Sequence, residues 1–496
     1  MNGRLVAARK SKNWKQVRAS EEIGVDLRTY QRWERGDSTP QPYYRDKLCE
    51  VFGMPLKDLG YDFLAEVTTG PVAQLHGNSI QISQLNSIEE QRDWASWFGL
   101  KLAQILGLLK MTSLWSIDFS EEIQTLVDQE IKMIDETLEQ HQAVEQQAIS
   151  RRQALVSIAA LPLALLGLRS EPIADAATQD FLSQCAASIT ACWHLLRGNG
   201  LTAVSDIIPQ FIPQLKTLAL HSSKYQRTAA RLAAQASILQ AILAMHRLNF
   251  ASREAHCKEA IHYAGISGDN NLRAAALTYL AYTYSFCYVP RRPEMGIQTF
   301  LEALHAVDDN APLLRSNISM GLAEAYAQCK EEQQALYYID LAQTHFPAFP
   351  ELDPSYIYGD CSLHVLFQWQ GKMYLELSVH YTNRGYQRKA ANALMQGSGV
   401  QSISARSTAE TIIYQADASR ILGELDIYAT SLRQAAQMAS DLGSQKRYSE
   451  AFSVFERTPE KWHRERQIQV LAKDVFGPLP GRKQMNDRIH RSPYNH

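Results

Sequence analysis

The stretch "GLAEAYAQCKEEQQALYYIDLAQ", residues 321–343, indicates the fold of most of the chain. Apolar residues recur at helical spacing on both sides of a short polar turn, so the stretch predicts two consecutive helices. Small residues such as Ala323, Ala335 and Ala342 let two antiparallel helices approach closely, while Leu322 and Ile339 can fill the seam to the next pair. The stretch therefore predicts a helical hairpin that stacks on further hairpins.

The same spacing recurs along the chain. Three pairs of alanines stand 19 residues apart: Ala241 and Ala260, Ala323 and Ala342, and Ala416 and Ala435. "YLAYTY" at 279–284 fits if three residues are inserted at the turn, and "WQGKMY" at 369–374 fits in its first helix but poorly in its second. These offsets resemble those of tetratricopeptide (TPR) repeats, although the small-residue anchors 241, 281, 323, 371 and 416 are 40 to 48 residues apart. The resemblance implies stretched repeats in an all-helical solenoid.

The length of 496 residues is too great for one hydrophobic core, so we expect several domains. The fold class we predict is all-α, with a five-helix head followed by a TPR-like solenoid. The predicted divisions are a head at 1–64, a linker at 65–88, a helical connecting region at 89–170, repeats at 171–478 and a disordered tail at 479–496.

Two segments of the connecting region have an apolar pattern. Val127, Ile131, Ile134 and Leu138 form a helical stripe that packs either on its own chain or across a homodimer seam. The apolar run in 154–168 is shorter than the ~20 residues that span a bilayer, and a proline interrupts it. We therefore expect a buried helix there and no membrane partner.

The residues give no sign of catalysis. The chain lacks the common nucleotide-binding, hydrolase and metalloprotease motifs, so we expect neither an enzyme nor a cofactor nor a metal site. Its seven cysteines are an odd number without a CxxC pair, which favours free thiols in a reducing compartment and hence a cytoplasmic protein.

The head has a different chemistry. Residues 1–60 hold 12 Lys and Arg against 8 Asp and Glu, while the rest of the chain holds 38 against 44. In "GVDLRTYQRWERGDSTP", residues 24–40, helical spacing turns Val25, Tyr30 and Trp33 inward. It leaves on the outer faces Leu27, Arg28, Thr29, Gln31 and Arg32. Because Arg28 and Arg32 lie one helical turn apart, they can contact guanine edges in a DNA major groove.

Residues 3–60 resemble the phage-repressor-like (XRE-type) helix-turn-helix family. The resemblance lies in Gln16 at the start of the second helix, in the turn around Gly24, and in the W-E-x-G that closes the third helix. It implies binding to double-stranded DNA, with phosphate contacts from Gln16, Arg35, Tyr43 and Arg45. It also implies a structural ion pair between Arg9 and Glu34. A head that has been repurposed for protein contact is the alternative.

A helix-turn-helix head followed by a repeat solenoid resembles the peptide-responsive regulators of bacteria. The resemblance implies a sequence-specific transcriptional regulator that forms a homodimer and whose solenoid binds a peptide or protein ligand. Counting from the anchors places on the inner face Tyr282, Asn317, Glu324, Gln368, Lys372, Asp417 and Arg420. These side chains either bind an extended peptide or line an empty groove. The alternative function is a TPR scaffold or adaptor that recruits a protein partner, with the head as an anchor.

Overall fold

The computed structural model divides the chain into two units, residues 1–93 and 94–496. The residues that it describes are 3–12, 14–23, 25, 27–35, 47–49, 51–54, 58–59, 120–139, 152, 155–162, 175–353, 355, 361–400, 402 and 404–476. Across these residues the regular structure is helical and contains no strand, which confirms the predicted fold class. The predicted linker at 65–88 and the predicted tail at 479–496 lie outside the described residues, as does most of the connecting region.

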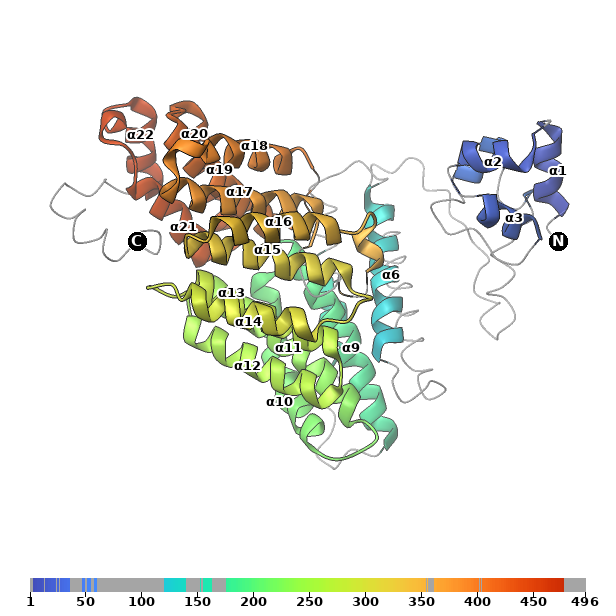
Figure 1. Cartoon of the computed structure of the whole chain (residues 1–496). Coiled ribbons are helices and arrows are strands. Elements are labelled where there is room, and N and C mark those ends of the chain that lie inside the picture. Colours follow the sequence, from blue (N-terminus) through green and yellow to red (C-terminus); the bar gives the residue numbers. More distant parts are fainter. Residues whose placement is uncertain are drawn as a thin grey trace, which may run out of the picture. The chain divides into compact units, whose positions relative to one another are not determined.

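The first unit contains the helices α1 (Gly3–Ser11), α2 (Gln16–Ile23) and α3 (Leu27–Arg35), with further helical residues at 47–49 and 51–52. Figure 1 shows the three labelled helices at the N-terminal end of the chain. Their shared core includes Leu5 of α1, Ile23 of α2 and Tyr30 of α3, each with no more than 1% of its surface exposed. The short helices thus close over one small apolar centre.

The second unit is a succession of helices that runs from green to red in Figure 1. They are α9 (Asp175–Arg197), α10 (Leu201–Leu220), α11 (Gln226–His246), α12 (Phe250–Ser267), α13 (Asn270–Phe286), α14 (Pro293–Ala306), α15 (Pro312–Gln328), α16 (Glu332–His345), α17 (Leu363–His380), α18 (Tyr386–Ser398), α19 (Ala405–Leu422), α20 (Leu425–Asp441), α21 (Gln445–Glu456) and α22 (Arg466–Leu471). From α11 to α20 each odd-numbered helix packs against the helix that follows it, which makes five hairpins.

The first helices of the five hairpins also pack against one another in a row, and α21 continues this row. Contacts run from α11 to α13, α15, α17, α19 and α21 in turn, and α11 also contacts α21 directly. The row of first helices therefore curves until its two ends meet. This closure brings residues nearly 200 positions apart into contact, as in the hydrogen bond between His246 of α11 and Ser444 at the start of α21.

The alanine spacing corresponds to this packing. The quoted stretch 321–343 spans the end of α15 and most of α16, and all six alanines of the three pairs are fully buried. The expectation of a poor fit after "WQGKMY" is wrong, because α18 packs closely on α17. Ala390 stands 19 residues after Gly371, and a Cβ added to Gly371 would lie 2.5 Å from Leu394 Cγ. The small residue at the anchor is thus glycine rather than alanine.

Gly321 on α15 provides a test of this close packing. An added Cβ would lie 2.5 Å from Cε1 of the buried Phe300, so we expect Gly321→Ala to cost about 1–3 kcal/mol in packing. That cost exceeds the gain of about 0.5–1 kcal/mol from alanine in a helix. At Gly265 of α12 a Cβ meets nothing within 4 Å, so Gly265→Ala should raise the free energy of unfolding. Urea unfolding that moves both variants in the same direction would contradict this packing.

The connecting region contributes α6 (Ser120–Glu139), which packs against α9. Val127 and Ile131 of the predicted stripe are buried there, whereas the side chains of Ile134 and Leu138 lie outside the described residues. Within the apolar run, the described Leu155, Ile158 and Ala159 are also buried. The described half of the stripe, Val127 and Ile131, therefore packs on its own chain.

One helix in the described part of the chain, α11, is long and apolar enough to cross a membrane by length and composition. However, 83% of that stretch is buried inside the structure, where it packs against α10, α12 and α13. All seven cysteines are free thiols, and Cys185 and Cys192 are fully buried in α9.

Candidate functional site

The outward side of α3 is the first candidate site. Tyr30 and Trp33 are buried and hold the inner side of this helix, whereas Arg32 and Arg35 are exposed. Leu27 and Gln31 are half-buried. The backbone of α3 includes Arg28 and Thr29, but their side chains lie outside the described residues, as do Tyr43 and Arg45. The exposed arginines leave the C-terminal half of α3 positively charged.

An ion pair ties α1 to the end of α3. Arg9 Nε lies 2.5 Å from Glu34 Oε1, and Arg9 Nη2 lies 3.1 Å from Glu34 Oε2. Arg9 Nη1 also donates to the carbonyl oxygen of Trp14 at 2.8 Å. Burial raises the pKa of Glu34, but the hydrogen bonds from Arg9 and Gln16 lower it by more. The net pKa of Glu34 is therefore below its usual value. The carboxylate therefore stays ionised and holds α3 in place.

Gln16 has a role that the sequence did not predict. Its Nε2 donates to Glu34 Oε2 at 2.6 Å, and its Oε1 accepts from Gln31 Nε2 at 3.2 Å. In this structure the side chain thus joins α2 to α3, whereas the family resemblance assigns it a DNA phosphate. The two roles share one amide, because a phosphate contact through Nε2 competes with Glu34 for the same donor.

In comparisons with known proteins, the part of the chain that matches a family is the head. Residues 5–59 match the family described as Helix-turn-helix. No curated protein and no solved structure matches the chain. Residues 5–59 are a helix-turn-helix domain of the XRE type, and the match supports a DNA-binding regulator of transcription.

The second candidate site is a cavity of about 150 Å³ in the repeat unit, which we call the central cavity. All six helices of the row contribute to its lining: α11, α13, α15, α17, α19 and α21. Five of the seven predicted groove residues line it: Tyr282, Asn317, Glu324, Gln368 and Lys372. The structure brings these five together from three hairpins.

Asp417 and Arg420 do not line the central cavity. Asp417 forms ion pairs with Arg420 at 2.8 Å and with Arg457 at 3.2 Å. The reason is the position of α19, which meets the cavity with its first half, between Arg406 and Tyr414. Asp417 and Arg420 lie beyond that half, so the spacing from the anchor places them too far along the helix.

Lys372 lies in a cage of aromatic rings and carboxylates. It is only 4% exposed, and its Nζ is 2.8 Å from Glu324 Oε2 and 3.6 Å from Glu410 Oε1. The same ammonium lies 3.9 Å from the centroid of the Trp369 ring and 5.1 Å from that of Tyr414. Burial raises the pKa of Glu324 more than Lys372 lowers it. The cage fixes one cation of the cavity in place.

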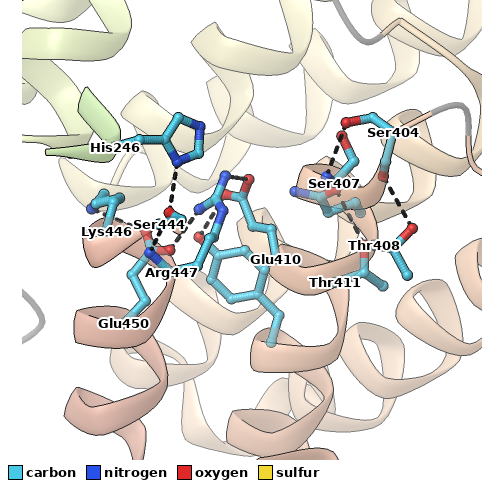
Figure 2. A network of polar contacts seen from close by, with 12 residues as sticks. His246, Ser404, Ser407, Thr408, Glu410, Thr411, Ser444, Lys446, Arg447 and Glu450 are labelled. Carbon is cyan, nitrogen blue, oxygen red and sulfur yellow. Dashed lines mark hydrogen bonds and ion pairs between the residues drawn. The ribbon is translucent and has the colours of Figure 1, made fainter. Parts of the chain in front are cut away.

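A second polar network lies beside the cavity, between α19 and α21 (Figure 2). Arg447 binds Glu410 of α19, and its Nη1 lies 2.5 Å from Oε2 of Glu450. Lys446 lies 3.0 Å from Glu450, and His246 Nδ1 is 2.6 Å from Ser444 Oγ. The network therefore joins α11 to α21, the two ends of the row of helices.

The sequence contained a signal for some of the lining residues that were missed. An aromatic residue stands two places before the small-residue anchor in three repeats: Tyr279, Trp369 and Tyr414. All three line the central cavity. Glu410 stands six places before its anchor, the same offset as Asn317. By contrast, Arg253 lies on the second helix of its hairpin, where the anchor spacing has no such signal.

Proposed function

We propose that this protein is a sequence-specific transcriptional regulator that binds double-stranded DNA through α3 and binds an effector in its repeat unit. The helix-turn-helix match at residues 5–59 is the observation that supports this function most strongly. The clamp of Arg9 on Glu34 supports it further, because it holds α3 at a defined angle with its arginines exposed. In this class of domain the third helix enters the major groove.

In the proposed mechanism, regulation depends on the two-fold symmetry of a homodimer and on the distance between its two heads. A homodimer presents two heads to two operator half-sites about one helical turn of DNA apart, and that distance tolerates little change. If the repeat unit has two arrangements and the effector binds one of them more tightly, the effector changes the separation of the two heads. That change alters the affinity of the protein for the operator. The repeat unit thus acts as sensor and as oligomerisation surface.

Substitutions of the arginines of α3 test whether this helix recognises DNA bases. We expect Arg28→Ala and Arg32→Ala each to cost about 1–3 kcal/mol of binding and to relax base preference at one position. Gln16→Ala should weaken all sequences alike, because a phosphate contact carries no base preference. Genomic footprinting with the purified protein identifies the sites, and titrations at constant salt then measure the affinities.

Lys10→Ala is the control, since it removes one exposed positive charge from α1, away from the recognition helix. If the arginine variants bind as tightly as the Lys10 variant, the assignment of base reading to Arg28 and Arg32 is wrong. If the wild-type protein enriches no discrete sites, the proposal of a transcriptional regulator is rejected. Recovery of folded protein partners by the full chain would then favour the scaffold or adaptor.

A further inference from the structure

The lining of the central cavity has an excess of positive charge. It contains six cationic side chains: Arg253, Arg291, Lys372, Arg406, Lys446 and Arg447. Its described carboxylates are three: Glu324, Glu410 and Glu450. Even when Glu376 is added, which lies 2.6 Å from Arg291, the described cations outnumber the described carboxylates by two. A cleft whose lining has an excess of one sign attracts a ligand of the other sign.

One of these cationic side chains, Arg253, has only neutral hydrogen-bond partners among the described residues. The residue is 2% exposed, its Nε donates to Thr283 Oγ1 at 2.8 Å, and its Nη2 lies 3.5 Å from the carbonyl oxygen of Tyr279. Both partners are neutral, and the buried Nη1 has no hydrogen-bond partner among the residues that the structure describes. A buried guanidinium without an anionic partner is costly, and an anion in the cavity removes that cost.

Flat aromatic surfaces form another part of the same lining. The ring of Tyr282 stacks on that of Trp369 with centroids 5.1 Å apart, and Phe286 lies 5.4 Å from Trp369. The Arg253 guanidinium reaches this wall through Tyr279, whose ring centroid is 6.0 Å from it. The cavity therefore offers an anion-binding group beside an apolar wall.

The volume limits the size of the ligand. A cavity of about 150 Å³ holds a molecule of the size of benzene. Sites for larger ligands range from roughly 300 to 1,000 Å³. An extended peptide of several residues therefore does not fit wholly inside the central cavity, although a peptide-responsive regulator is the class that the domain order resembles.

We propose that the central cavity binds a small organic anion, in which a carboxylate or phosphate group is attached to a flat apolar group. Its size is on the order of ten non-hydrogen atoms. The anionic group accepts hydrogen bonds from Arg253, and the apolar group packs against Trp369 and Tyr282. The role of this anion as an effector rests on the proposed function, whereas its binding rests on the cavity alone.

Isothermal titration of the full chain tests the proposal with benzoate and phenyl phosphate as probes. Benzamide is the neutral isostere of benzoate, and inorganic phosphate lacks the apolar group. We expect at least one of the two aromatic anions to bind, benzamide to bind about tenfold or more weakly, and inorganic phosphate to bind weakly. Arg253→Gln should reduce the affinity for the anion by a similar factor, whereas Arg273→Gln, an exposed change on α13, should not.

A second measurement uses the wild-type protein, so it stands even if Arg253→Gln does not fold. Cys287 and Cys361 line the central cavity, whereas Cys329 does not. A bound anion should slow alkylation of Cys287 and Cys361 by iodoacetamide and leave Cys329 unchanged, as measured by peptide mass spectrometry. Equal binding of benzamide, no binding of either aromatic anion, or protection of these thiols only by a hexapeptide would overturn the proposal.

The two proposals fail in different ways. If the protein footprints discrete operators but neither aromatic anion binds, the anion site is rejected and the regulator stands. If an anion binds in the cavity but the wild-type protein has no operator, the site stands and the regulator is rejected. A change in operator affinity on addition of the bound anion supports both.

Discussion

Replacement of Arg447 by methionine is expected to lower the free energy of unfolding of the repeat unit by about 3 kcal/mol. Arg447 is 6% exposed and binds two carboxylates, those of Glu410 and Glu450. Its removal leaves Glu450 buried and Glu410 half-buried, with Lys372 and Lys446 as the remaining described cations paired with them. The loss weakens the link between α19 and α21, because Arg447 joins the two helices through its ion pair with Glu410 (Figure 2).

Urea unfolding of the full chain, followed by circular dichroism, measures this loss. Arg433→Met is the matched control, since Arg433 is exposed on α20. The midpoint of the control should stay close to that of the wild type. Equal destabilisation of the two variants would show that the network contributes nothing specific.

The effect of Arg447→Met should also depend on pH. Burial raises the pKa of Glu450, but Arg447 and Lys446 outweigh it, and the net pKa is lowered to about 2. A lowered pKa contributes stability above the unfolded value of about 4.3, and this stability is lost as the pH falls toward the folded value. The difference between wild type and variant should therefore be largest at neutral pH and shrink below about pH 4.

The second large effect is expected in the head, where Arg9→Ala should cost about 3 kcal/mol. The side chains of Arg9 and Glu34 are 12% and 4% exposed, so removal of the arginine leaves a carboxylate with little access to water. Gln16 remains bonded to Glu34 but carries no charge to neutralise it. We therefore expect α1 and α3 to open more often.

Hydrogen exchange of peptides from α1 and α3 in the full chain measures this opening locally. Lys10→Ala is the control, because Lys10 is the neighbouring cation and is exposed. Faster exchange in the Arg9 variant alone is the expected result. If both variants exchange at the same rate, the ion pair does not hold the head together.

Local spacing was enough to predict the elements. Alanines 19 residues apart predicted the hairpins, because a small residue is needed wherever two helix axes approach closely. The inward positions of Tyr30 and Trp33 followed from helical periodicity, and the family resemblance indicated the pairing of Arg9 with Glu34. The poor fit expected for the second helix after "WQGKMY" shows the limit, since Ala390 has the same spacing from Gly371.

The central cavity was decided by tertiary structure. Periodicity assigns a residue to a face of its helix, but the small rotations between successive hairpins add up along the row, and their sum decides which helical turns meet. Glu324 and Lys372 therefore reach the cavity, whereas Asp417 at the same offset from its anchor does not. The contact of α11 with α21, the excess charge at Arg253 and the paired acids around Arg447 all depend on that closure, because no local spacing encodes it.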